Sequence, residues 1–225
     1  MRKFKSFIAL DLKSNAQNIS IVKNLHNHVY GFKVGYRSFY NKRSNDLISE
    51  IKKKKSKLFL DLKLHDIPNT VKKSIEGITS LPISMLTIHI SGGRDMMKAT
   101  MDAVSGKEIK IFGVTALTSL SDEDTNKIFK RTASDQVEAM LDLAESVGID
   151  GVVCSPHELE LVGKRKSLLS ITPGIRLDNQ NDDQKRIMTP KEALNLGADY
   201  LVIGRPITAS NDISKSLEEI YLSIQ

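Results

Sequence analysis

The segment KLFLDLKLHDIPNT, residues 57–70, combines charged side chains with the alternating pattern of a β-strand. One face of this strand carries Leu58, Leu60, Leu62 and Leu64, and the other carries Phe59, Asp61, Lys63 and His65, because side chains alternate across a strand. A carboxylate and an ammonium group are then held side by side, where they could stabilise a developing charge and transfer a proton. Burying two charges costs several kcal/mol unless they are paired, so we interpret Asp61 and Lys63 as functional. The alternative to a functional role is a structural ion pair, or an edge strand whose charged face is exposed to solvent.

Two other predicted strands also carry a charge near their C-terminal end. Asp11 ends the apolar run FIALDL, and Lys33 lies inside GFKVG. Both would reach the same end of a parallel barrel as Asp61 and Lys63, and the active sites of such barrels lie at that end. Each residue alone is more often a strand end that meets solvent. Together the four charges indicate an acid–base array.

One more acidic residue follows the charged strand. Asp66 comes three residues after Lys63, and Pro68 stands where a proline is tolerated at the start of a helix. Asp66 would therefore lie on the rim of the site. A simple cap or turn residue would occupy the same position.

The C-terminal part of the sequence has features of a phosphate site. TPGIR occupies residues 172–176, the polar loop DNQNDDQKR follows, and LVIGRPI occupies residues 201–207. The loops after the last two strands of a barrel commonly bind phosphate, where glycine allows close approach and arginine binds in a forked pair. Gly204 and Arg205 are the candidates. A Gly-Arg pair alone is a weak signal.

The elements that must position these residues alternate regularly along the chain. We predict eight strands, at residues 7–12, 31–35, 57–64, 85–90, 109–117, 151–155, 168–172 and 200–203. Helices are predicted at residues 16–28, 45–55 and 133–147, and Gly148 indicates a helix stop. Eight βα units predict a single (β/α)8 TIM barrel over residues 1–225, although a doubly wound open sheet would give a similar pattern.

Composition narrows the classes of protein that fit. The chain has 225 residues, of which 40% are hydrophobic and 27% charged, and this is enough for one large core. Cys154 is the single cysteine, so an internal disulfide is excluded and a thiolate metal site is not expected. The longest charge-free stretch, residues 77–93, falls short of the roughly 20 apolar residues that span a bilayer. With no signal peptide in the first residues, we expect a cytoplasmic protein without a membrane span.

The net charge of +6 raises the question of nucleic-acid binding. The clustered lysines are Lys52, Lys53, Lys54, Lys55 and Lys57, just before an apolar strand. Positive charge is favourable at the C-terminal end of a helix, and no aromatic residues alternate with these lysines. We therefore interpret the cluster as a solvated helix end and expect no nucleic-acid partner, while an anionic small substrate fits the charge.

With these motifs in order, the sequence resembles the orotidine 5'-phosphate decarboxylase family from Asp11 to Arg205. The segment DLKLHDIPNT carries that family's Asp-x-Lys-x-x-Asp core, and ALD, FKVG, LTS, TPGIR, DDQ-x-R and IGR occur in the expected order. Two features differ from the family. Tyr36 and Arg37 follow FKVG where the family usually has a Met-Glu or similar pair, and the loop between Arg176 and Gln184 is short.

The resemblance implies an activity and a set of site residues. The activity is decarboxylation of orotidine 5'-monophosphate to uridine 5'-monophosphate, the last step of de novo pyrimidine nucleotide synthesis, with no cofactor and no metal. The implied charged network is Lys33, Asp61, Lys63 and Asp66, with Lys63 as the proton donor. The implied substrate contacts are Asp11 and Lys33 at the ribose hydroxyls, Thr118 at the pyrimidine, and Arg176, Gln184, Arg205 and the backbone of Gly204 at the phosphate. Asp66 and Thr70 are expected to reach the neighbouring subunit's site, which makes a homodimer the catalytic unit.

Two other functions fit parts of the sequence. A magnesium-dependent sugar-phosphate decarboxylase or hexulose-phosphate synthase shares the barrel and the Asp-x-Lys-x-x-Asp core, but that group has an acidic metal ligand near the position of Lys33. A basic binding protein for nucleic acid would leave the inward Asp61 and Lys63 without an explanation.

Overall fold

Eight parallel strands form a closed barrel in the order in which they occur along the chain. The computed structural model describes residues 5–117, 120–177 and 188–224. The strands are β1 Ser6–Ala9, β2 Gly31–Gly35, β3 Lys57–Leu64, β4 Ile83–His89, β5 Lys110–Val114, β6 Gly151–Val153, β7 Leu169–Thr172 and β8 Tyr200–Ile203. Pairing of Phe7 in β1 with Val202 in β8 closes the ring, so the predicted (β/α)8 barrel is confirmed and the open-sheet alternative is wrong.

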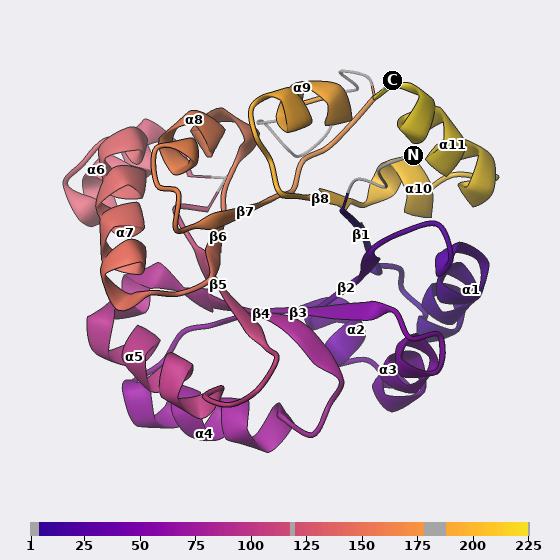
Figure 1. Ribbon diagram of the computed structural model, residues 1–225, viewed down its shortest axis with the longest axis horizontal. Coiled ribbons are helices and arrows are strands. Elements are labelled where there is room, and N and C mark those ends of the chain that lie inside the picture. Colours follow the sequence, from indigo (N-terminus) through magenta and orange to yellow (C-terminus); the bar gives the residue numbers. More distant parts are fainter. Residues whose placement is uncertain (1–4, 118–119, 178–187, 225) are drawn as a thin grey trace.

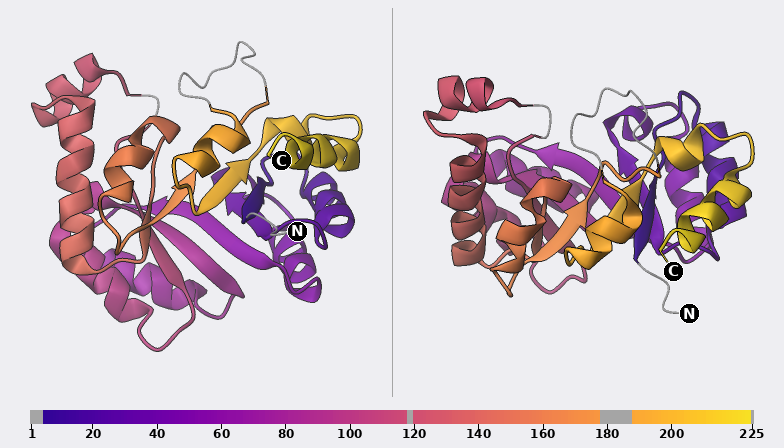
Figure 2. Two further views of the ribbon diagram at one scale, coloured as in Figure 1. Left: turned by 45° about the horizontal axis from the view of Figure 1, so that its top comes forward. Right: turned by 90° about the horizontal axis from the view of Figure 1, so that it is seen from above.

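Helices surround the barrel on its outer side (Figures 1 and 2). They are α1 Asn15–Leu25, α2 Tyr36–Phe39, α3 Ser44–Lys53, α4 Pro68–Ile78, α5 Gly93–Ala103, α6 Asp122–Phe129, α7 Ala133–Val147, α8 Leu159–Gly163, α9 Pro190–Asn195, α10 Arg205–Thr208 and α11 Ile213–Leu222, with 3-10 turns at Ile90–Gly92 and Pro156–Glu158. None of the helices described is long and apolar enough to cross a membrane.

Local signals in the sequence account for several element ends. The Thr132 side chain accepts a hydrogen bond from the backbone N–H of Asp135 and begins α7. Gly148 ends this helix with a φ of 80°, as the predicted stop requires. Pro68 occupies the first turn of α4, also as predicted. The first strand is shorter than the predicted residues 7–12. It ends at Ala9, and Asp11 lies beyond it.

The two faces of the strands pack in separate apolar layers. An outer layer between strands and helices contains Leu58, Leu60 and Leu62 of β3. An inner layer fills the barrel and consists of Phe7, Ala9, Phe59, Met85, Phe112, Ile171, Tyr200 and Val202. Since Phe59 lies inside, Asp61 and Lys63 on the same face of β3 are directed toward the barrel interior, as the alternation predicted.

Candidate active site

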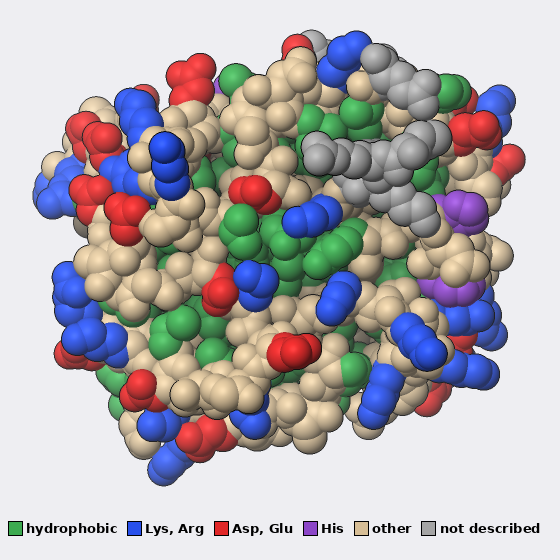
Figure 3. All heavy atoms as spheres, viewed as in Figure 1, with side chains coloured by type: hydrophobic (Ala, Val, Ile, Leu, Met, Phe, Trp, Pro, Cys, Tyr) green, Lys and Arg blue, Asp and Glu red, His purple; other side chains and the backbone are tan. Residues whose placement is uncertain are grey.

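A cavity of about 670 Å3 opens at the C-terminal ends of the strands. Its apolar lining includes Ala9, Phe59, Val153, Ile171 and Val202, and its charged lining includes Asp11, Lys13, Lys33, Arg37, Asp61, Lys63, Arg176 and Arg205. Figure 3 shows hydrophobic side chains over the centre of the barrel with Lys, Arg, Asp and Glu side chains around them. An apolar floor with charged walls suits a ligand that carries both a flat ring and anionic groups.

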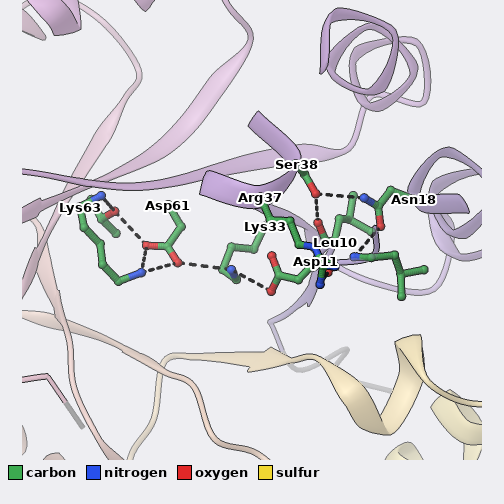
Figure 4. Close-up of polar contacts among 10 residues, drawn as sticks. Leu10, Asp11, Asn18, Lys33, Arg37, Ser38, Asp61 and Lys63 are labelled. Carbon is green, nitrogen blue, oxygen red and sulfur yellow. Dashed lines mark hydrogen bonds and ion pairs between the residues drawn. The ribbon is translucent and has the colours of Figure 1, made fainter. Parts of the chain in front are cut away.

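Four charged side chains form a continuous line across this cavity (Figure 4). The Lys63 Nζ lies 2.8 Å from both carboxylate oxygens of Asp61. The Lys33 Nζ lies 3.3 Å from Asp61 Oδ2 and 3.3 Å from Asp11 Oδ2. Because β1, β2 and β3 are neighbours in the barrel, their C-terminal ends bring these residues together. The acid–base array predicted from the sequence is therefore present.

Burial and pairing act in opposite directions on the two most enclosed charges. Burial would lower the pKa of Lys33, but the carboxylates of Asp61 and Asp11 outweigh it and raise the pKa above 10.5. Burial would raise the pKa of Asp61, but Lys33 and Lys63 lower it below 3.8. Both groups are therefore ionised at neutral pH, and the cavity presents a fixed pattern of charge.

The backbone at Lys63 departs from regular strand geometry. Lys63 has a φ of 42°, in the left-handed region that a residue other than glycine adopts at a cost of about 1–3 kcal/mol. The register of β3 against β4 shifts between Leu60 and Leu64, which indicates a bulge. Thr87 of β4 lies opposite this bulge, and its Oγ1 accepts a hydrogen bond of 2.8 Å from the Lys63 backbone N–H. The Thr87 hydroxyl thus holds the bulged Lys63 backbone, while the Lys63 side chain lines the cavity.

The loop after β1 is held by side chains of α1 and α2. The Ser38 hydroxyl donates to the carbonyl of Leu10, and Asn18 Nδ2 donates to Ser38 Oγ at 3.0 Å. Arg37 Nη1 donates to the carbonyl of Asp11 at 3.1 Å. These contacts anchor the backbone that carries the Asp11 carboxylate beside Lys33. Arg37 is one of the two residues that differ from the Met-Glu or similar pair after FKVG. It contacts this loop and also lines the cavity.

The predicted phosphate residues that the structure describes lie together on one side of the cavity. Arg176 follows β7, whereas Gly204 and Arg205 follow β8, and all three line the cavity. Gly174, between the end of β7 and Arg176, has a φ of 80°, a conformation that favours glycine in the TPGIR segment. Thr118 and Gln184, also predicted to contact the substrate, lie outside the described residues.

Asp66 and Thr70 are not among the residues that line the cavity of their own chain. Asp66 Oδ1 accepts a hydrogen bond of 2.7 Å from the Ile67 backbone N–H, and both Asp66 and Thr70 are exposed. Ile67 is 66% exposed, and Tyr40, stacked on Tyr36, is 73% exposed. The rim beside β3 therefore carries apolar side chains that a single chain leaves in water.

Sequence reasoning missed Thr87. It lies in the apolar run MLTIHI and shares its face of β4 with Met85, which belongs to the inner layer. A hydroxyl residue on the inward face of a barrel strand is a usable signal, because such faces are usually apolar. Its partners could not be assigned without the register of β4 against β3.

Together the fold and the cavity define a class of protein: a (β/α)8-barrel enzyme with an ionic array at its C-terminal mouth and with Arg176 and Arg205 in the cavity wall. The family model described as Orotidine 5'-phosphate decarboxylase / HUMPS family matches residues 5–220. An orotidine 5'-phosphate decarboxylase of Wolbachia pipientis subsp. Culex pipiens (strain wPip) is 45% identical over 219 residues, which cover 96% of each chain. One of Ehrlichia chaffeensis is 52% identical over 171 residues, 74% of each chain. The crystal structure of orotidine 5'-phosphate decarboxylase from Lactobacillus acidophilus has a TM-score of 0.83 and 33% identity, with 99% of each chain covered.

The chain belongs to the orotidine 5'-phosphate decarboxylase family, and it is a carboxy-lyase of that kind. The resemblance found in the sequence motifs is confirmed.

Proposed function

We propose that this chain converts orotidine 5'-monophosphate to uridine 5'-monophosphate and carbon dioxide, as the last step of de novo pyrimidine nucleotide synthesis, with Lys63 as the proton donor. The observation that carries the proposal is the bidentate contact of the Lys63 ammonium with Asp61 at 2.8 Å, inside a cavity with an apolar floor. We assign the reaction no cofactor and no metal, and we expect it in the cytoplasm.

The proposed chemistry uses charge placement. When the bond to the carboxylate breaks, its electron pair stays on the ring carbon as a carbanion. The Lys63 ammonium stabilises that charge and then transfers a proton to the carbon, and solvent reprotonates the amine. Asp61, held by the two lysines, stands against the departing carboxylate and disfavours it in the ground state. We give stabilisation of the carbanion more weight than this repulsion, and the required rate enhancement is larger than any single ion pair can supply.

The remaining residues would bind the parts of the nucleotide that do not react. Asp11 and Lys33 hold the ribose hydroxyls, Thr118 contacts the pyrimidine, and Arg176, Gln184, Arg205 and the backbone of Gly204 hold the phosphate. Phosphate binding remote from the ring contributes to turnover by fixing the ring against Lys63. The position of Arg176, Gly204 and Arg205 on one side of the cavity supports this assignment.

We further propose that the active form is a homodimer in which Asp66 and Thr70 complete the partner's site. The exposed Asp66 carboxylate and the exposed side chains of Ile67, Tyr36 and Tyr40 support an interface between two copies. Mixing Lys63→Ala chains with Asp66→Ala chains tests the sharing. One of the two sites in the mixed dimer would then have both residues, so activity should rise well above that of either variant. A verified heterodimer without any recovery contradicts it.

The direct test of the proposed function is an absorbance assay with orotidine 5'-monophosphate in the presence of a strong chelator. We expect full turnover under these conditions. The magnesium-dependent sugar-phosphate decarboxylase or hexulose-phosphate synthase alternative predicts no turnover of this nucleotide and a chelator-sensitive reaction with a sugar phosphate. The curated relatives at 45% and 52% identity bear the name of the nucleotide decarboxylase, which disfavours that alternative.

A further inference from the structure

Thr87 lies in the interior of the barrel wall, beside the charged residues of β3. Its side chain is completely buried and is part of β4 between Leu86 and Ile88. A threonine hydroxyl has one proton to donate and can also accept hydrogen bonds. Buried hydroxyl groups require partners, because leaving one without a partner costs free energy comparable to that of a lost hydrogen bond.

The hydrogen bonds of Thr87 have a defined direction. Its Oγ1 accepts from the Lys63 backbone N–H at 2.8 Å, so its own proton is available for Asp61 Oδ1 at 3.0 Å. The Lys63 side chain donates to the same carboxylate at 2.8 Å. Thr87 thus joins the backbone of Lys63 to the carboxylate that receives the Lys63 side chain, and closes a ring of hydrogen bonds.

This ring of hydrogen bonds includes a backbone segment in an unfavourable conformation. Lys63 has a positive φ of 42°, and its N–H lies in a bulge where the regular ladder between β3 and β4 is interrupted. The hydroxyl of Thr87 replaces the missing ladder partner of that N–H. Because the direction of the Lys63 side chain follows from its φ, the same hydroxyl controls where the ammonium group is directed.

We propose that Thr87 is a positioning residue for decarboxylation, whose hydroxyl locks the Lys63 backbone and the Asp61 carboxylate together and so directs the ammonium at the reacting carbon. This role rests on the proposed function, because it acts through the proposed proton donor. In this proposal the hydroxyl group of Thr87 positions Lys63 and Asp61, and the methyl group has no role in positioning.

The variants that test this role separate the hydroxyl from the volume of the side chain. Thr87→Val removes the hydroxyl and keeps the shape, whereas Thr87→Ser keeps the hydroxyl and removes the methyl group. Thr100→Val is the matched control, because Thr100 is also completely buried and its hydroxyl donates only to the Met96 carbonyl within α5, at 2.9 Å. Thr87→Ala replaces Thr87→Val in the comparison if the valine variant does not fold.

We expect Thr87→Val to lower kcat by about 10- to 100-fold and to change KM by less than about threefold, because a hydrogen bond to a charged group is lost without a change in nucleotide contacts. Thr87→Ser should retain kcat within about threefold of the wild type, as should Thr100→Val.

A second measurement does not depend on turnover. The titration of Asp61 is followed by carboxyl 13C NMR and assigned with Asp61→Asn. Loss of a donor should raise the Asp61 pKa by about one unit in Thr87→Val and leave it unchanged in Thr87→Ser and Thr100→Val. The charged and titratable groups around Asp61 are Lys33, Lys63, Tyr36 and His89, and they are the same in all these proteins.

The results that test the role of Thr87 can be distinguished from those that test the proposed function. A wild-type protein that does not decarboxylate the nucleotide refutes the proposed function, while the NMR comparison still reports on the Thr87 hydroxyl. Wild-type kcat together with an unshifted Asp61 in Thr87→Val overturns the positioning role. Equal losses in Thr87→Ser and Thr87→Val also overturn it, since the methyl group would then be responsible.

Discussion

Replacement of Lys63 by alanine is the most direct perturbation of the proposed chemistry. The change removes the ammonium group that contacts both oxygens of Asp61 and leaves Lys33 as the neighbouring cation, at 3.3 Å. We expect turnover to collapse while nucleotide affinity changes little, because the Lys63 contact strengthens only as negative charge develops on the ring carbon.

The expected size of the effect follows from the position of the ammonium. The side chains of Lys63 and Asp61 are 28% and 10% exposed, so the screening is that of a partly buried site. A carbanion about 3 Å from the ammonium would gain about 5 kcal/mol at an effective dielectric constant of about 20. That is about ten-thousand-fold in rate, and loss of the proton donor adds to it. KM should change by less than about tenfold.

The assay is the absorbance change of the nucleotide, measured at substrate concentrations that define kcat and KM separately. Lys57→Ala is the matched control, since Lys57 begins the same strand at its opposite end and is exposed. This control should keep wild-type kinetics. A Lys63→Ala protein that retains kcat within about tenfold of the wild type and loses mainly affinity would refute the assigned role.

Three further predictions concern the fold and its titrating groups. Gly31→Ala should destabilise the protein in urea unfolding, because a Cβ there would lie 2.3 Å from the Lys57 carbonyl, whereas Gly77→Ala inside α4 should stabilise by about 0.5–1 kcal/mol. Burial acts to raise the pKa of Asp61, but the flanking ammonium groups of Lys33 and Lys63 lower it below its value in the unfolded chain. The ionised carboxylate therefore stabilises the fold at neutral pH, and this contribution is lost as the pH falls. The difference in unfolding free energy between wild type and Asp61→Asn should shrink from neutral pH to about pH 3. Burial raises the pKa of the Cys154 thiol, so a thiol reagent should react slowly with the native protein and quickly in urea, and fast native labelling would contradict this.

Much of the architecture could be predicted from local patterns in the chain. The alternation of leucines with Phe59, Asp61 and Lys63 assigned both faces of β3, because side chains in a strand alternate whatever surrounds them. Gly148 ended α7 where predicted for an equally local reason, the ease with which glycine adopts a positive φ. Eight predicted βα units favoured a closed barrel, and the pairing of β1 with β8 in the structure excluded the open-sheet alternative.

The end of β1 was less predictable. The apolar run continues through Leu12, yet β1 ends at Ala9 and the backbone beyond it is held by Ser38 and Arg37 from α2. Hydrophobicity alone does not mark where a strand stops pairing, because the stop depends on contacts with residues more than 20 positions away.

The amino-acid sequence by itself determined the eight βα units, the inward face of β3, and the four charges of Asp11, Lys33, Asp61 and Lys63. Only the tertiary structure decided how those charges are held. The positive φ of Lys63 and its hydrogen bond to Thr87 depend on the register of β4 against β3, and register is a relation between segments that no local pattern contains.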